Sequence, residues 1–189
     1  MDLMKAIHQR RAVRDFLPEA VRQEELRALI DAAIQAPSSM NRQSWSFTVV
    51  TNRQLLDSWE PKIKECALSV FGNDPEHSQL HEQLQSGEFH VFYRAPALIV
   101  IAATEPDDMA RADCALAAEN LMLAATARGL GTCWIGLAVP WLDSPAGMAA
   151  AFIPPAHSVV APIIVGYPRA IPAAPERRKP HITWIPAAG

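Results

Sequence analysis

Arginines cluster near the start of the chain, at Arg10, Arg11 and Arg14. A guanidinium is permanently charged and presents a planar set of donors, so it suits a phosphate or an aromatic ring that gains negative charge. A helix is expected to begin at Met4, and on a continuous helix Arg10 and Arg14 would share one face. A solvated helix end, where arginine complements the helix dipole, explains the same pattern. The cluster therefore indicates either a site for a planar phosphorylated molecule or a basic surface.

A polar turn between an expected helix and an expected strand offers a second set of binding groups. It runs from Pro37 to Trp45. Hydroxyls, amides and free backbone donors in such a turn suit hydrogen bonds to a ring edge or a phosphate. The alternative is that they satisfy the backbone of the turn itself. Its short polar side chains include Ser38, Ser39, Asn41 and Gln43.

A glycine-rich segment runs from Gly129 to Gly136. Glycine allows a flat ring to lie against the backbone, whose N–H groups then face the ring edge. Gly129 is equally suited to end the preceding helix, and Cys133 and Trp134 are equally suited to a buried strand.

The end of the chain, residues 168–189, is expected to be an extended arm, because its recurrent prolines disfavour helices and central strands. Its apolar residues within 182–185 need a surface to cover, and another subunit is the expected host. Arg177 and Arg178 lie on this arm. They are either part of a solubilising charge run or, with the upstream arginines, close over a phosphate.

Hydrophobic patterning predicts the elements that must position these groups. Helices are expected over residues 24–35, 52–68 and 108–128, and strands over 47–51, 97–103, 130–138 and 159–166. The last three strands are apolar enough for the inside of a sheet. The alanine-rich helix 108–128 is expected to be buried on most sides, and residues 72–92 are expected to be polar and mobile. This order of elements favours an α+β fold.

Composition limits the classes of function. The chain has 189 residues and a net charge of −3, which favours one domain and disfavours nucleic acid as a partner. No apolar run reaches the roughly 18 residues of a membrane span, and the polar N-terminus is unlike a signal peptide, so a cytoplasmic protein is expected. The three cysteines are widely spaced, which favours reduced thiols over a disulfide framework or a metal site.

Taken together, the four segments resemble the FMN-binding signature of the nitroreductase family from Ile7 to Trp184. The matching motifs occur in the family's order. They are Arg-Arg-x-x-Arg-x-Phe from Arg10, Ala-Pro-Ser-Ser-x-Asn-x-Gln-x-Trp from Ala36, Gly-Leu-Gly-Thr-Cys-Trp-Ile-Gly from Gly129, and Val-Gly-Tyr-Pro at 165–168. The resemblance implies a central, mostly antiparallel sheet flanked by helices in a domain-swapped homodimer, with flavin sites in the subunit interface.

The resemblance also implies a division of the site between two chains. Arg10 and Arg14 would approach the phosphate and pyrimidine sides of FMN, and the backbone near Gly136 would lie by the reactive N5 edge. The serine-rich turn would come from the other subunit. Two positions depart from the family, since Ala12 replaces a serine and Ser44 replaces a proline. The candidate cofactor-binding residues are Arg10, Arg11, Ala12, Arg14, Pro37, Ser38, Ser39, Asn41, Gln43, Ile135, Gly136, Arg177 and Arg178.

The implied activity is that of an FMN-dependent oxidoreductase with a ping-pong mechanism. NADH or NADPH passes a hydride to flavin N5 and leaves, and an electron-poor acceptor such as a nitroaromatic or a quinone is then reduced. No catalytic side chain is required, because the flavin supplies the chemistry. Residues 69–95 are the expected variable wall or lid over the acceptor pocket.

Three alternatives stay open on the sequence. The chain is compatible with a specialised relative that dehydrogenates, dehalogenates or fragments its substrate with the same flavin. It is also compatible with a non-catalytic flavin-binding dimer, or with a structural dimer whose basic clusters are solvated. Neither the acceptor nor the preference between NADH and NADPH follows from the sequence.

Overall fold

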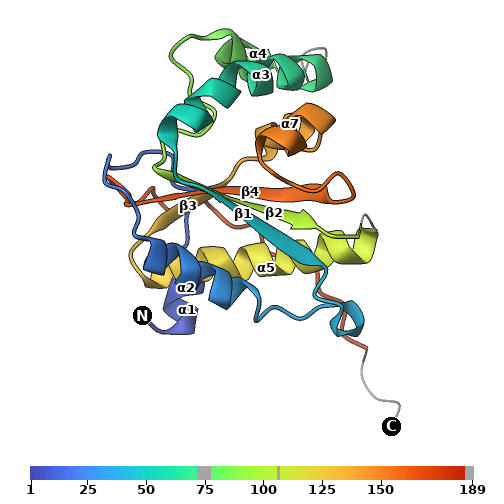
Figure 1. Ribbon diagram of the computed structural model, residues 1–189. Helices are drawn as coiled ribbons and strands as arrows, with labels where there is room; N and C mark the ends of the chain where they lie inside the picture. Colours follow the sequence, from blue (N-terminus) through green and yellow to red (C-terminus); the bar gives the residue numbers. More distant parts are fainter. Residues whose placement is uncertain (72–77, 106, 186–189) are drawn as a thin grey trace.

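The computed structural model describes residues 1–71, 78–105 and 107–185. Within these residues, four antiparallel strands form one sheet in the order β1-β2-β4-β3 (Figure 1). The strands are β1 (Trp45–Val50), β2 (Ala97–Ala103), β3 (Gly131–Trp134) and β4 (Ser158–Gly166). The expected α+β fold with an antiparallel sheet between helices is thereby confirmed.

Helices cover both faces of the sheet, as Figure 1 shows. One face carries α1 (Leu3–Gln9), α2 (Gln23–Ala33) and α5 (Asp108–Ala127). The other carries α3 (Arg53–Phe71), α4 (Ser78–Gln85), α6 (Val139–Leu142) and α7 (Pro145–Ala150). Short 3-10 turns, η1 (Ser39–Asn41) and η3 (Gly136–Ala138), lead into β1 and α6. No helix in the described part of the chain is both long enough and apolar enough to cross a bilayer.

The inner strand β2 supplies the cores on both faces of the sheet. All seven of its residues are buried, and successive side chains of a strand point to opposite faces. Ile99 and Ile101 pack with α2 and α5, whereas Leu98 packs against the opposite helices. On that side Trp59 and Trp141 pack in a tilted arrangement, with ring centroids 5.6 Å apart. The expected central strand at 97–103 is therefore confirmed.

The long helix α5 begins and ends where its sequence signals lie. Asp107 caps it by accepting a hydrogen bond from the Ala110 N–H at 2.7 Å, and Gly129 follows its end with φ of +77°, as a left-handed helix stop requires. The face of α5 toward the sheet is buried, but the side chains of Met109 and Leu116 are exposed. The prediction that α5 is buried on most sides thus holds for its inner face.

Two sequence predictions were wrong near one contact between distant segments. Ala12 forms a parallel bridge with Thr132, and the Val13 N–H donates to the Thr132 carbonyl at 2.9 Å. The helix α1 therefore ends at Gln9, and Arg10 and Arg14 do not share a helical face. β3 pairs with one strand of the sheet, β4, and so lies at an edge rather than inside, with the 12–13 segment along its outer side.

Residues 78–92 are more ordered than their polar sequence predicts. Residues 78–85 form α4, and Val91 and Phe92 are buried in the core. The rest of the expected mobile segment, residues 72–77, lies outside the described residues, and so do residues 186–189 of the arm. Residues 169–185 form no helix or strand, which agrees with the expected extended conformation.

Candidate functional site

A small cavity joins the N-terminal arginines to the glycine-rich segment. Its volume is about 130 Å³. Gly136 is exposed there, and a Cβ added to it would meet no heavy atom within 4 Å. A flat group can therefore approach this backbone, as the sequence predicts. The cavity is lined by Arg14, Val91, Tyr93, Cys133, Trp134, Ile135, Gly136 and Leu137.

Arg14 brings positive charge to this cavity, whereas Arg10 is not among its lining residues and pairs with Glu119. The Arg14 guanidinium lies 5.8 Å from the centroid of the Tyr93 ring, and Arg10 Nε is 3.3 Å from Glu119 Oε1. Burial raises the pKa of the Cys133 thiol, while Arg14 and, more weakly, Arg10 act in the opposite direction. Cys133 itself stays protonated at neutral pH, so it is not a nucleophile.

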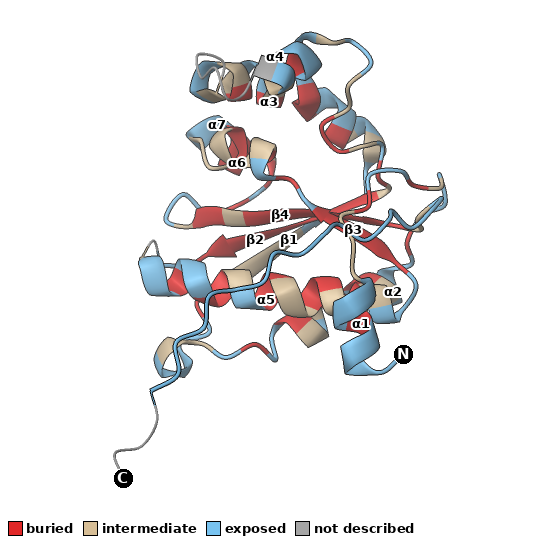
Figure 2. Cartoon of the chain, turned by 180° about the vertical axis from the view of Figure 1, so that it is seen from behind, coloured by how far each residue is buried: buried red, intermediate tan, exposed pale blue. Residues whose placement is uncertain are grey.

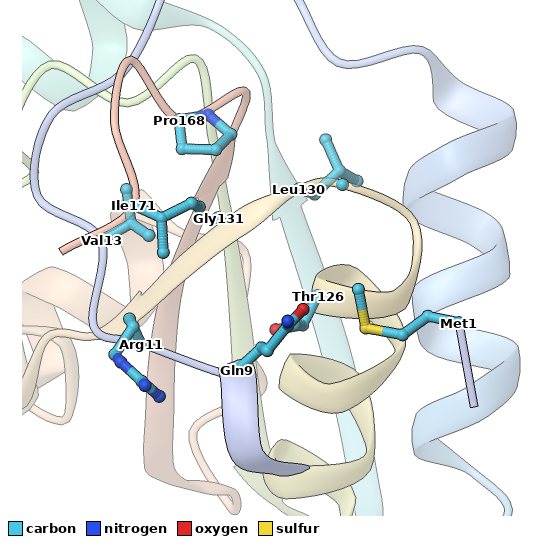
Figure 3. Close-up of a pocket in the computed structure, with 10 residues that line it drawn as sticks. Met1, Gln9, Arg11, Val13, Thr126, Leu130, Gly131, Pro168 and Ile171 are labelled. Atoms are coloured by element: carbon cyan, nitrogen blue, oxygen red, sulfur yellow. The ribbon is translucent and has the colours of Figure 1, made fainter. Parts of the chain in front are cut away.

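Arg11 points elsewhere. Its Nη1 donates to the carbonyls of His8 at 2.8 Å and Arg10 at 2.7 Å, so it caps the end of α1. Its Nε is buried without a hydrogen-bond partner in the described part of the chain. Arg11 lines a different cavity of about 540 Å³, and Figure 3 shows its side chain pointing away from Val13 and Ile171. The structure therefore separates Arg11 from the other two arginines.

The serine-rich turn is held by α5 and by its own polar groups. The Ser39 N–H donates to both carboxylate oxygens of Asp113 on α5, at 3.1 and 3.0 Å. Ser38 Oγ accepts the Gln43 N–H at 3.1 Å, and Gln43 Nε2 donates to Asn41 Oδ1 at 3.2 Å. The bond from Gln43 to Ser38 is one by which such a turn satisfies its own backbone. Pro37, Asn41 and Gln43 nevertheless remain exposed, so the turn still presents polar groups to a ligand.

The turn and the Arg14 cavity lie at opposite edges of the sheet. The turn leads into Trp45 at the start of β1, whereas the cavity adjoins the end of β3 at Trp134. Three strand spacings separate β1 from β3, which corresponds to about 14 Å. One chain thus does not gather the predicted residues around one cavity.

The remaining candidates lie on the arm and do not line the Arg14 cavity. Figure 2 shows it leaving the sheet after β4 and passing in front of α5 in that view. Arg177 and Arg178 are exposed along it.

FMN fits this cavity only in part. Ligand pockets usually measure about 300 Å³ or more, and the cavity at Arg14 is about 130 Å³. Its positive charge and open glycine backbone suit one portion of a phosphorylated flat cofactor. The geometry is that of a half-site.

Tyr93 also lines this cavity. Its position depends on the turn before β2, where both Tyr93 and Arg94 have positive φ, of 50° and 54°. Neither residue is a glycine, asparagine or aspartate, so no local sequence signal announces this conformation.

Comparisons with known proteins agree with the motifs. The nitroreductase family model matches residues 7–167. A relative from Methanothermobacter thermautotrophicus, whose name pairs NADH dehydrogenase with NAD(P)H nitroreductase, is 29% identical over 173 residues, covering 89% of this chain and 78% of the relative. A 5,6-dimethylbenzimidazole synthase from Rhodospirillum rubrum is 27% identical, covering 91% of this chain and 88% of the synthase.

A solved structure shares the fold over almost its whole length. It is a nitroreductase with bound FMN from Bacteroides fragilis, with 29% identity and a TM-score of 0.84, covering 98% of this chain and 99% of that one. The family match at residues 7–167 includes β1 to β4 and the Arg14 cavity. The chain therefore belongs to the nitroreductase family.

Proposed function

We propose that this chain is an FMN-dependent oxidoreductase that takes a hydride from NADH or NADPH and reduces an electron-poor acceptor such as a nitroaromatic or a quinone. The observation that carries the proposal is the half-site of Arg14 and Gly136 in a chain of this family. The FMN bound by the Bacteroides fragilis relative supports it. Bound FMN would supply the hydride chemistry at its N5 atom.

The residues of this chain have binding roles in the proposal. Arg10 and Arg14 provide positive charge for the phosphate and for the reduced ring. The backbone at Ile135 and Gly136 lies against the flat ring, and Tyr93 forms part of the wall opposite. We assign residues 69–95 to the variable wall of the acceptor pocket, which is supported by Val91 and Tyr93 lining the cavity.

A homodimer completes the site in this proposal. The serine-rich turn of one chain would meet the Arg14 cavity of its partner, because the two features lie at opposite edges of the sheet. The arm supports this arrangement, since Ile182, Trp184 and Ile185 are 59%, 83% and 90% exposed and need an apolar surface. Arg177 and Arg178 would then close over the phosphate of the partner's cofactor.

A second candidate is a specialised enzyme that uses the same flavin for another oxidation. It is favoured by the 27% identity to a relative named 5,6-dimethylbenzimidazole synthase, over 91% of this chain. Both candidates require the same flavin half-site, so they differ in the acceptor rather than in the cofactor.

Two measurements test the proposal in sequence. The purified protein is expected to be yellow, with a flavin absorbance band that is released as FMN on denaturation. Rapid mixing with NADH or NADPH in the absence of oxygen is then expected to bleach that band. A colourless protein that binds no added FMN contradicts the flavin site, and a yellow protein bleached by neither donor contradicts the reductase activity.

A further inference from the structure

The turn between α4 and β2 has a strained backbone beside the Arg14 cavity. Tyr93 and Arg94 both have left-handed φ values, of 50° and 54°. This conformation costs free energy for residues with a side chain, and it persists only where the surroundings impose it. Backbone bonds close the turn, from the Tyr93 N–H to the His90 carbonyl at 3.0 Å and from the Ala95 N–H to the Phe92 carbonyl at 2.9 Å.

A buried carboxylate on α3 holds this turn. Glu60 is 7% exposed, its Oε2 lies 3.0 Å from His90 Nδ1, and its Oε1 accepts the Phe92 N–H at 3.4 Å. On the far side of the imidazole, Arg94 Nη2 lies 2.8 Å from His90 Nε2. A guanidinium can only donate, so Nε2 accepts and the ring proton sits on Nδ1, where it is donated to Glu60.

The strained turn presents Tyr93 to the cavity. Phe89 packs edge-on against the Tyr93 ring at 5.8 Å, and the Arg14 guanidinium lies 5.8 Å from the same ring. Burial raises the pKa of the Tyr93 phenol, and Arg14 opposes that rise. Tyr93 therefore lies beside Arg14, and the proposed function gives Arg14 a role in binding the flavin.

We propose that Glu60 and His90 are positioning residues of this site, which hold the 90–94 turn in its strained conformation and so seat Tyr93 against Arg14. Neither residue lines the cavity, and both act through the turn. The inference rests on the proposed function for the consequence at FMN, but the seating of Tyr93 is a property of the chain itself. If Glu60 and His90 only joined α3 to the turn, substituting them would change the free energy of unfolding without changing the position of the Tyr93 side chain.

The first test follows Tyr93 without reference to activity or to the cofactor. The chain has two tyrosines, so NMR of protein labelled at the tyrosine Cζ gives two signals, and Tyr93→Phe assigns them. In Glu60→Ala the Tyr93 phenol is expected to titrate at lower pH than in the unmodified protein. Glu65→Ala, at an exposed position on the same helix, is expected to leave it in place. Glu60→Gln has one acceptor oxygen, so it can keep the bond from His90 but not also the bond from the Phe92 N–H, and it is expected to give a smaller shift. A Tyr93 titration unchanged in Glu60→Ala overturns the inference.

The second test measures coupling between Glu60 and Tyr93 in FMN affinity. Glu60→Ala and Tyr93→Leu are each expected to weaken FMN binding roughly tenfold, and the double variant no further than either alone. Independent effects that multiply to roughly a hundredfold overturn the inference. If Glu60→Ala does not fold, both tests are made with His90→Ala, because the His90 side chain is less buried than that of Glu60. If the unmodified protein binds no FMN, the proposed function fails and the NMR titration still decides the seating of Tyr93.

Discussion

At the scale of single residues, Ser44 is buried with an unused hydroxyl. It is 2% exposed, and its Oγ has no hydrogen-bond partner in the described part of the chain. A buried hydroxyl without a partner is destabilising, so Ser44→Ala is expected to raise the free energy of unfolding by about 1 kcal/mol. Urea denaturation measures this. Ser46→Ala is the matched control, because Ser46 Oγ lies 3.0 Å from His157 Nδ1, and it is expected to destabilise. A loss of stability in both variants would contradict the prediction.

Charge at the flavin phosphate is the second prediction for single residues. Arg10→Ala and Arg178→Ala are each expected to remove a charge-assisted contact of about 1.5–3 kcal/mol and so to weaken FMN binding by roughly tenfold or more. Quenching of FMN fluorescence on titration measures the dissociation constant. Arg22→Ala is the control, because this side chain is 69% exposed on the surface at α2. If all three variants retained flavin equally on dialysis, the assignment of Arg10 and Arg178 to the phosphate site would be contradicted.

Some of the predicted cofactor-binding residues lie together in the structure. Arg14 and Gly136 lie at one cavity because a motif constrains the residues on both sides of β3. Arg11 has the same residue type in the same motif, yet it caps α1. Its direction depends on where α1 ends, which no residue between Arg10 and Arg14 reveals. The position of Tyr93 is hidden in the sequence for a similar reason. The turn that carries it is bonded through His90 and Phe92 to Glu60, which is distant in sequence.

At the scale of elements, Gly131 allows the N-terminal segment to lie along β3. A Cβ at this position would be 2.8 Å from Val13 Cγ2, so Gly131→Ala must push the 12–13 segment away. We expect a loss of about 1–3 kcal/mol in the free energy of unfolding, as for other overpacked sites, together with weaker FMN binding. Gly87→Ala is the control, because a Cβ there meets nothing within 4 Å. Equal stability of the two variants by urea denaturation would show that the segment is free to move.

The start of α5 gives the protein an acid-sensitive element. Hydrogen bonds from Arg42, helped by the Ala110 N–H, lower the pKa of Asp107 from its ordinary 3.8 to about 2. Because the folded-state pKa lies below the unfolded one, this stabilisation is present above about pH 4 and is lost as the pH falls toward 2. Urea denaturation at several pH values is expected to show stability falling over that range, less steeply in Asp107→Asn. Equal slopes in the two proteins would refute this role.

Elements with a local signal were predicted well, and those that depend on distant pairing were not. A continuous apolar run marks β2, and α5 has Asp107 at its start and Gly129 after its end. Each of these signals lies within its element or directly beside it. The chain leaves α1 to pair Ala12 with Thr132, which is 120 residues away, and the edge position of β3 follows from the order of the strands. No periodicity within either segment encodes that contact.

At the scale of the whole molecule, the arm is predicted to join two chains. Truncation before Pro175 removes Arg177, Arg178 and the exposed apolar side chains of 182–185. The truncated protein is expected to dissociate at higher concentrations than the full chain and to carry less FMN, since both the interface and a phosphate contact are lost. Analytical ultracentrifugation with absorbance at the flavin band measures both properties together. An intact dimer fully loaded with flavin would contradict the role of the arm.

The sheet has two differently protected edges. The edge at β3 is covered by the chain's own residues 12–13, whereas β1 has a paired neighbour on one side, β2, among the described residues. Val49 on that strand is 40% exposed, and an open apolar edge is a template for pairing with other chains. Until the proposed homodimer forms, this edge is open to pairing with other chains, so edge-to-edge aggregation is expected to compete with assembly.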